Sequence, residues 1–453
     1  MRFIARSLAF VAALAFVAQP IAAQDVGILR DSETERLLKD MVNPLVEAAG
    51  MPKDAVDVVI VNDPSVNAFT SQGQVIYINS GLINAADSAN QVQGVMAHEL
   101  GHIVGGHAIG IDQGFNRAGK ITILSLLVGV AAALAGSADA AMGAISMGQQ
   151  AAYGSLLAFS RAQESSADAA GASFLSKAHI SGRGSLQFFE KLQNLEFRYG
   201  YPHDEEAAFA STHPLSGDRI ATLREVYEKD PAWNTKTDPA LEERFQLAKA
   251  KLYGYLADPA DTLRHYPPYV TTEPARYARV YAYHKESRLD DALREADALL
   301  AEKPDNPYFL EIKGQVLLES GKAEAALAPL RKATELTGND PLIASTFGLA
   351  LVNTEDKSHL DEAENVLRAA VARDRENPMA WYELGLVYGA KGDIPRASLA
   401  SAEQQIMTDN AAQALRSATT AMAGLQKDSP DWIQAQDISM QARTQLERKK
   451  DHK

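Results

Sequence analysis

The feature that most constrains this chain is the pattern H-E-x-x-H, which lies in the apolar stretch 95–103 as His98-Glu-Leu-Gly-His102. On an α-helix, His98 and His102 lie about 40° apart around the axis and about one turn along it, so both imidazoles can bind one metal ion. The run 88–104 is long enough to form such a helix. The pattern therefore predicts a metal-binding helix with an apolar surround.

Glu99 supplies the second part of the chemistry. Its carboxylate does not easily reach the ion that His98 and His102 bind, but it can take a proton from a water molecule whose pKa zinc lowers to about 7. A carboxylate in that position is the general base of a metal-assisted hydrolase. We therefore predict a zinc peptidase with one Zn²⁺ per chain, with His98 and His102 as metal ligands and Glu99 as the catalytic base.

The third metal ligand has to come from another part of the chain. A longer helix motif would place a histidine six residues after His102, but that position is Ala108, and His107 comes one residue early. On a continuous helix His107 lies about 140° from His102, which favours a position in solvent or beside a ligand over ligation. Glu164 and Asp168, four residues apart in a run free of Gly and Pro, offer carboxylates. One can bind zinc while the other accepts the second N–H of a ligating histidine.

Several stretches between about residues 67 and 220 carry a resemblance to a known family: Asn67-Ala-Phe69, Val75-Ile-Tyr-Ile-Asn-Ser-Gly-Leu82, His98-Glu-Leu-Gly-His102, Glu164 with Asp168, Ser211-Thr-His-Pro214 and Asp218-Arg219. Through them the chain resembles the HtpX- and CaaX-prenyl-protease-type zinc metallopeptidases, which are gluzincins. The resemblance implies a zincin-like domain in which Glu164 is the third metal ligand and Asp168 holds a ligating histidine. It also implies that strand 74–79 is an edge strand that binds the substrate backbone, although an internal strand is the alternative.

Two basic residues near the end of this stretch are further catalytic candidates. His213 lies in the turn sequence Thr212-His-Pro214. We predict that it is either a fourth zinc ligand in a resting state or a hydrogen-bond donor to the tetrahedral oxyanion. Arg219 is a second candidate for the oxyanion. The simpler alternative for both is a structural role.

The N-terminus has the pattern of a cleaved secretory signal. Arg2 and Arg6 precede an apolar stretch, 8–18, which is too short to span a membrane and is followed by small residues before Gln24. We predict a signal peptide at 1–23, a metallopeptidase domain at 24–235 and a periplasmic location. The chain has no cysteine, so it forms no disulfide and carries no lipid on cysteine. Its net charge of −14 argues against nucleic acid as a partner.

The segment 121–160 is unusual because it is nearly free of charge. No charged residue occurs from 121 to 138, and after Asp139 none occurs until Arg161. The segment is rich in Ala, Gly and Ser and only weakly apolar in its second half, which argues against a membrane span. We predict a pair of buried or interfacial helices that cover the catalytic cleft and contact a membrane surface peripherally or an unfolded client.

The C-terminal half contains an internal repeat. Asn306-Pro307, Asp340-Pro341 and Asn377-Pro378 recur at intervals of 34 and 37 residues, a period typical of tetratricopeptide helix pairs. We predict a helical connector at 236–268 and an all-α tetratricopeptide array at 269–447, with a degenerate first unit at 277–300 and two closing helices. Each repeat contacts mainly its neighbours, so we expect the peptidase domain to fold without the array. In the third repeat, the signature positions hold Trp381, Leu384, Gly385, Tyr388 and Ala397.

Together these patterns predict an α+β, mainly helical chain, with a zincin-like metallopeptidase domain followed by a tetratricopeptide array. The resemblance implies a periplasmic zinc-dependent metalloendopeptidase that hydrolyses unfolded or misassembled outer-membrane proteins. The array would then contact the outer-membrane assembly machinery. The alternative is an assembly chaperone that acts mainly through the array and carries a latent peptidase.

Overall fold

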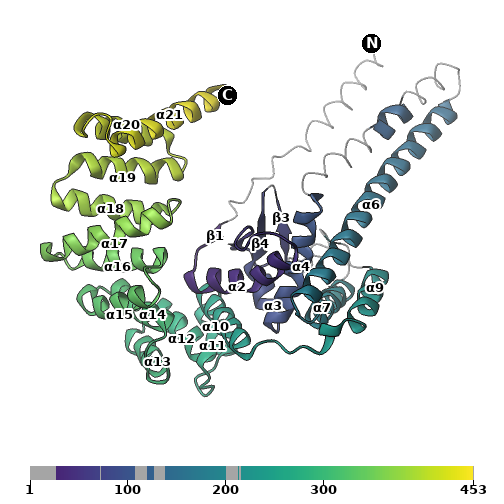
Figure 1. The fold of residues 1–453 in the computed structure, drawn as a ribbon, viewed down its shortest axis with the longest axis horizontal. Helices are drawn as coiled ribbons and strands as arrows, with labels where there is room; N and C mark the ends of the chain where they lie inside the picture. The colour runs from purple at the N-terminus through teal and green to yellow at the C-terminus, as the bar shows by residue number, and fades with distance from the viewer. Residues whose placement is uncertain are drawn as a thin grey trace, which may run out of the picture.

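The computed structural model describes residues 27–71, 73–107, 120–126, 138–199, 213 and 216–451. The predicted signal peptide and the two neighbours of His213 in the chain, Thr212 and Pro214, lie outside these residues. The described part consists of an N-terminal α+β region and a stack of helix pairs (Figure 1), as the sequence predicts.

A small mixed sheet lies at the centre of the N-terminal region. Its order is β1-β2-β4-β3, with β2 parallel to β4 and the two outer strands antiparallel to their neighbours. The strands are β1 (Ile28–Leu29), β2 (Asp57–Val61), β3 (Ala68–Thr70) and β4 (Val75–Asn79).

The prediction that strand 74–79 lies at the edge of the sheet is wrong. That strand is β4, which is paired on one side with β2 and on the other with β3. Phe69 of β3 lies opposite Tyr77 of β4, and their rings stack with centroids 5.0 Å apart. With three residues, β3 is too short to show the alternation by which a strand is recognised in a sequence. The outer strand on this side is therefore β3.

The metal-binding helix α4 (Ala89–Val104) forms where it was predicted and lies in the core of the N-terminal region. It packs closely on α6 (Ala138–Lys177) through two glycines. A Cβ on Gly101 would lie 2.5 Å from the carbonyl oxygen of Ala167, and one on Gly171 would lie 2.9 Å from that of Ala97. Such distances leave no room for a side chain, so the glycines permit the approach that brings Glu164 beside α4. The other helices of this region are α2 (Ser32–Ala48), α3 (Ser80–Ala85), α7 (Arg183–Tyr199) and α9 (Gly217–Glu228).

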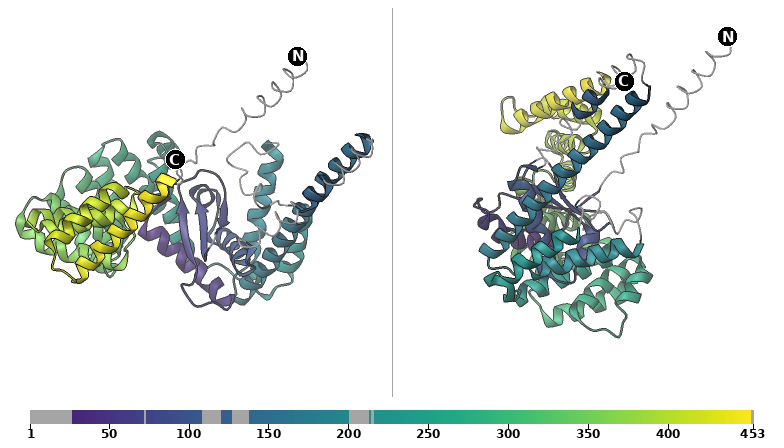
Figure 2. Two further views of the ribbon diagram at one scale, coloured as in Figure 1. Left: turned by 90° about the horizontal axis from the view of Figure 1, so that it is seen from above. Right: turned by 90° about the vertical axis from the view of Figure 1, so that its right-hand side faces the viewer.

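The first half of α6 projects away from the sheet (Figures 1 and 2). The helical residues 120–126 lie against it, with the side chain of Ser125 over Gly148. Of the two predicted forms of this pair, the buried one is wrong for the described residues, because the weakly apolar sequence leaves many side chains without a core to enter, and the interfacial one stays a prediction. No described helix has the length and hydropathy needed to cross a membrane. Large exposed side chains on the pair are Ile123, Leu124, Leu126, Met142, Met147 and Tyr153.

The repeats form antiparallel helix pairs that stack side by side (Figure 1). The recurring dipeptides begin the first helix of three pairs, because Asn306, Asp340 and Asn377 cap the helix N-terminus and proline occupies its first turn. The pairs are α12 (Glu273–Lys285) with α13 (Leu289–Glu302), α14 (Pro307–Glu319) with α15 (Ala323–Leu336), α16 (Pro341–Asn353) with α17 (Leu360–Arg373), α18 (Pro378–Lys391) with α19 (Ile394–Met407), and α20 (Ala411–Gly424) with α21 (Pro430–Asp451).

Two connecting helices, α10 (Pro239–Leu256) and α11 (Pro259–His265), join the regions. Lys251 of α10 is buried, and its ammonium group contacts Asp31 and lies 3.5 Å from Glu33 and 3.8 Å from Glu311. The hydroxyl of Tyr277 in the first repeat donates to Glu33 at 2.8 Å. The array is therefore attached to the N-terminal region through a buried polar cluster.

Candidate metal centre

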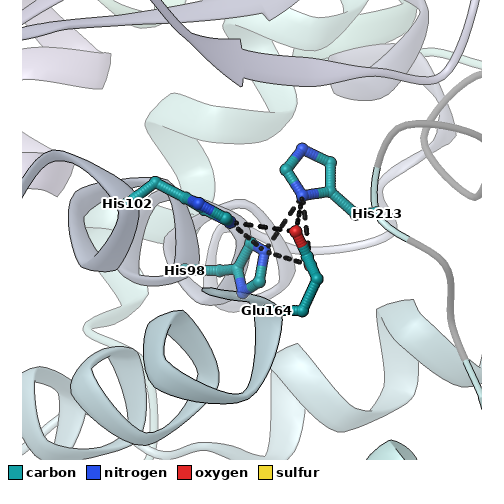
Figure 3. A group of neighbouring side chains, drawn as sticks. All are labelled: His98, His102, Glu164 and His213. Atoms are coloured by element: carbon teal, nitrogen blue, oxygen red, sulfur yellow. Dashed lines mark hydrogen bonds and ion pairs between the residues drawn. The ribbon is translucent and has the colours of Figure 1, made fainter. Parts of the chain in front are cut away.

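Four side chains from three parts of the chain converge on one point (Figure 3). His98 and His102 come from α4, Glu164 from α6 and His213 from the segment before α9. One donor atom from each lies within 4.8 Å of the others. His98 Nε2 lies 3.1 Å from His102 Nε2, and the Glu164 carboxylate lies 3.3 Å from the first and 3.4 Å from the second.

His213 faces the same point through Nδ1. This atom lies 3.1 and 3.2 Å from the two Glu164 oxygens and 3.3 Å from His98 Nε2. All four side chains are buried, with exposed fractions from 2% for His98 to 7% for His102 and His213. Imidazoles and a carboxylate gathered at such distances form the donor set that zinc prefers.

Glu99 provides an independent test of whether this donor set fits a metal. Its side chain is 0% exposed, and neither carboxylate oxygen has a hydrogen-bond partner among the described residues. The nearest basic contact is His213 Nε2, at 3.5 Å from Oε1. A buried carboxylate without a donor is costly unless a polar molecule reaches it. The residues present thus fit a metal, since a water molecule bound to it would give the Glu99 carboxylate a hydrogen-bond donor.

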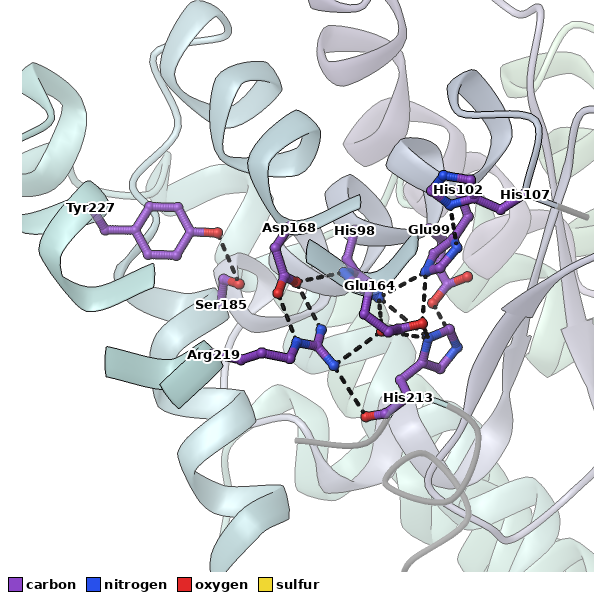
Figure 4. Close-up of polar contacts among 10 residues, drawn as sticks. All are labelled: His98, Glu99, His102, His107, Glu164, Asp168, Ser185, His213, Arg219 and Tyr227. Carbon is purple, nitrogen blue, oxygen red and sulfur yellow. Dashed lines mark hydrogen bonds and ion pairs between the residues drawn. The ribbon is translucent and has the colours of Figure 1, made fainter. Parts of the chain in front are cut away.

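Asp168 and Arg219 hold this group from behind (Figure 4). Asp168 lies 2.9 Å from His98 Nδ1, which is the ring nitrogen opposite the donor atom. Arg219 donates from Nε and Nη2 to the two Asp168 oxygens, both at 2.8 Å, and its Nη1 lies 3.0 Å from Glu164. A carboxylate on the outer nitrogen fixes the tautomer and orientation of a ligating histidine.

Two of the three carboxylates of the site, Glu164 and Asp168, are held in their charged forms. Burial opposes ionisation of Glu164, but hydrogen bonds with His102, His213 and His98 hold the pKa of its carboxyl well below the usual range. Burial likewise opposes ionisation of Asp168, whereas His98 and Arg219 lower its pKa. Glu99 differs, because burial raises its pKa above the usual value. A raised pKa makes Glu99 the better proton acceptor of the three.

The two histidines of α4 respond differently to the same surroundings. Burial alone would lower the pKa of His98, but hydrogen bonds with Asp168 and Glu164 raise it to about 10. Burial lowers the pKa of His102 to about 4, against an opposing hydrogen bond with Glu164. The site thus favours one positive charge near His98. A metal ion held by these residues would supply that charge in place of the proton.

The structure brings together every site residue that the sequence singles out: His98, Glu99, His102, Glu164, Asp168, His213 and Arg219. Their roles as metal ligands, base and oxyanion donors stay predictions. For Arg219, contacts with Asp168 and Glu164 give it a place behind the donor group. Sequence patterns did not reveal that the Phe189 ring packs edge-on against His98, with centroids 5.8 Å apart. Phe189 lies in α7, and the apolar periodicity of that helix predicts only that it is a core residue.

Comparisons with known proteins support the two-part organisation. Residues 32–227 match the model of peptidase family M48, and residues 277–341 and 355–411 match a tetratricopeptide-repeat model. The chain is 23% identical over 395 residues to the beta-barrel assembly-enhancing protease of Escherichia coli K12, covering 86% of this chain and 78% of that protein.

Two further relatives extend the comparison. A putative beta-barrel assembly-enhancing protease of Vibrio cholerae is 28% identical over 298 residues, which is 63% of this chain and 58% of that protein. Metalloprotease LoiP of E. coli is 31% identical over 168 residues, which is 36% of this chain and 60% of that protein. The match to the first of these two relatives covers a larger share of this chain than the match to LoiP does.

Proposed function

We propose that this chain is a periplasmic zinc metalloendopeptidase that hydrolyses unfolded or misassembled outer-membrane proteins. The chain is a homologue of the beta-barrel assembly-enhancing proteases, and its peptidase M48 domain precedes its tetratricopeptide repeats. The observation that carries the proposal is the convergence of His98, His102 and Glu164 beside the buried carboxylate of Glu99. The names of the relatives support the substrate class. The signal-like N-terminus supports the location.

In this proposal His98, His102 and Glu164 hold one zinc ion. A zinc ion held there polarises a peptide carbonyl and makes water a nucleophile at neutral pH. Glu99 takes the proton of the attacking water, which its raised pKa favours, and passes it to the leaving amine. Asp168 keeps His98 in the orientation that points Nε2 at the ion.

His213 controls access to this chemistry. Its Nδ1 lies as close to Glu164 as the histidines of α4 do, which supports a role for His213 as a fourth ligand in a resting state. A substrate then has to displace His213 before catalysis, which keeps basal activity low. If His213 serves instead as a donor to the oxyanion, its other nitrogen has to face the substrate carbonyl.

The outer strand β3 offers the place where the substrate backbone binds. β3 is last in the sheet order of the described residues and lies beside α4, which carries the two histidines. An extended peptide that pairs with β3 would run past the metal centre. Backbone pairing is indifferent to sequence, which suits a protease that acts on unfolded chains.

An assembly chaperone with a latent peptidase is the second candidate function. One observation favours it: α18, the first helix of the fourth helix pair, exposes apolar side chains one turn apart along one face, Met379 at 56%, Tyr382 at 51% and Leu386 at 38%. An exposed apolar stripe of this kind is typical of a surface that binds another protein.

Turnover of an outer-membrane β-barrel protein in living cells separates the two functions. Cells that lack the chromosomal copy are supplied with the wild-type chain or with Glu99→Gln, and the mass, half-life and assembly of the barrel protein are followed. A peptidase predicts that Glu99→Gln binds the barrel protein without degrading it. If turnover and assembly match those of the wild type, the chaperone function is correct and the peptidase proposal fails.

A further inference from the structure

We propose that His107 is a positioning residue for the metal centre, because it accepts a hydrogen bond from Nδ1–H of His102 and so leaves Nε2 of His102 free to bind the metal. The inference rests on the proposed function. It assigns a role to a histidine that lies outside the donor group (Figure 4).

The two ring nitrogens of His102 face different surroundings. Nε2 lies 3.1 Å from His98 Nε2 and 3.4 Å from Glu164 Oε1, so it faces the metal position. Nδ1 faces the other way and lies 2.9 Å from His107 Nδ1. A neutral imidazole carries one proton, and the nitrogen that binds a metal carries none. The proton of His102 is therefore on Nδ1, which donates a hydrogen bond to Nδ1 of His107, and the proton of His107 is on Nε2.

The chain after α4 has a special geometry that brings the His107 ring to this place. The helix ends at Val104, and Gly106 has a φ of +64°, in the left-handed region that favours glycine. Gly105 has an ordinary φ of −70°. A Cβ on Gly105 would nevertheless lie 2.5 Å from Nε2 and 2.8 Å from Cε1 of His107. The ring thus folds back over Gly105, and glycine is needed there because of the ring and not because of the backbone.

The two ligating histidines consequently have different outer partners. Asp168 holds His98 with a charged carboxylate, and His107 holds His102 with a neutral imidazole. Glu164 already contacts His102 on its inner side. A neutral partner fixes the His102 tautomer without adding a second negative charge to the same ring.

Metal affinity of matched His107 variants tests the proposal. His107→Phe keeps an aromatic ring of similar shape and removes the acceptor, whereas His107→Gln keeps an acceptor oxygen. Zinc affinity of the purified full chain is measured by competition with a chromophoric chelator, and the absorption spectrum of the Co²⁺-loaded chain reports the ligand field. We expect His107→Phe to weaken zinc binding by about 10- to 100-fold and to change the Co²⁺ spectrum, and His107→Gln to restore most of both.

Gly105 provides a second test through the same ring. Gly105→Ala should displace His107 and weaken zinc binding about as much as His107→Phe does. In a chain that already carries His107→Ala, the same change should have no further effect, because the ring it would strike is absent. Gly154→Ala, at a glycine of α6 with nothing within 4 Å of its Cβ position, is the control for adding a methyl group to a glycine.

The outcomes separate the failure of this inference from the failure of the proposed function. If the wild-type chain binds zinc and cleaves an unfolded protein while His107→Phe binds zinc equally well, only the role of His107 is overturned. Equal losses in His107→Phe and His107→Gln would also overturn it, since packing alone would then explain the effect. If the wild-type chain binds no zinc, the proposed function fails, and the inference fails with it.

Discussion

Two buried clusters of charged side chains in this molecule differ in what lies at their centre. At the candidate metal centre, the donor atoms of His98, His102, Glu164 and His213 point toward one another. In the second cluster, Asp31, Glu33 and Glu311 surround the ammonium group of Lys251. The lysine is itself the cation that the carboxylates require, so the second cluster is complete without a ligand. The first cluster brings lone pairs together, and an added cation stabilises it.

The Lys251 cluster also changes the prediction that the peptidase domain folds without the array. Asp31 and Glu33 belong to the N-terminal region, whereas Glu311 and Tyr277 belong to the first two repeats. Burial raises the pKa of Glu33 and raises that of Glu311 to about 7. A chain that ends near residue 268 would lose Tyr277 and Glu311 and expose the rest of the cluster. The contacts therefore favour one cooperative unit.

The largest expected effect is on stability. Lys251→Met removes the cation and leaves buried carboxylates without a partner, which costs about 3–5 kcal/mol of the free energy of unfolding. Urea unfolding, followed by circular dichroism, measures the change. Lys229→Met is the control, because Lys229 makes its ion pair with Glu225 on the surface, and it should leave the midpoint unchanged. A loss below about 1 kcal/mol for Lys251→Met would show that the cluster does not depend on its lysine.

The next effect is on metal binding. Glu164→Gln removes a charged ligand and should weaken zinc binding by more than the 10- to 100-fold expected for Asp168→Asn, which removes only an outer partner of His98. Chelator competition at fixed pH compares the two variants. Equal losses in both would mean that Glu164 is not a ligand.

His213→Ala distinguishes an inhibitory ligand from a catalytic donor, because the two roles predict changes of opposite sign. If His213 occupies the fourth coordination position of the metal in a resting state, its removal should raise the rate of cleavage of an unfolded protein about tenfold. That factor corresponds to a free-energy difference of about 1.4 kcal/mol. An oxyanion donor predicts a fall in kcat of about 100-fold or more. Activity within about twofold of the wild type, with zinc retained, would make His213 a structural residue.

The smallest effect concerns a buried carboxyl in the array. Glu383 is 1% exposed and bonds to the Ser345 hydroxyl at 2.5 Å. Burial raises the pKa of Glu383 to about 8, so the folded chain favours the protonated form. Its contribution is fully present below the unfolded pKa of about 4.3 and is lost as pH rises through about 8.

Glu383→Gln mimics the protonated carboxyl. It should therefore match the wild type near pH 4, and its advantage in the free energy of unfolding should grow as the pH rises from about 4.3 to about 8. Urea unfolding of both chains across this range gives the difference at each pH. A difference that does not change with pH would mean that Glu383 ionises freely in the folded chain.

The comparison of the two clusters also shows what a sequence reveals. The metal helix and the starts of the repeat helices were predictable because residues close together in the sequence determine each of them. Two histidines one turn apart mark the metal helix, and Asn or Asp followed by Pro marks the start of a repeat helix. The Lys251 cluster gave no such signal, since its members lie far apart in the chain and each is an ordinary charged residue.

Two local features were predicted incompletely for physical reasons. The sequence favoured a position of His107 in solvent or beside a ligand, and the structure places it beside His102. The angle of about 140° between the two side chains assumed a continuous helix, whereas Gly106 turns the chain and brings the His107 ring back to His102. The strand β3 was not predicted because its three residues are too few to show a periodic pattern. The edge of the sheet was therefore assigned to the longer strand β4.

The most direct test of the metal centre is a paired measurement on the purified wild-type chain and Glu99→Gln: zinc content per chain and the rate of cleavage of an unfolded protein. Glu99 is a buried base beside the ligands and not one of them, so we predict about one zinc in both chains and a rate lower by roughly 10²- to 10⁴-fold in the variant. Cleavage by Glu99→Gln at the wild-type rate, or loss of its zinc, would contradict the assignment of Glu99 as the base of a metal-dependent peptidase.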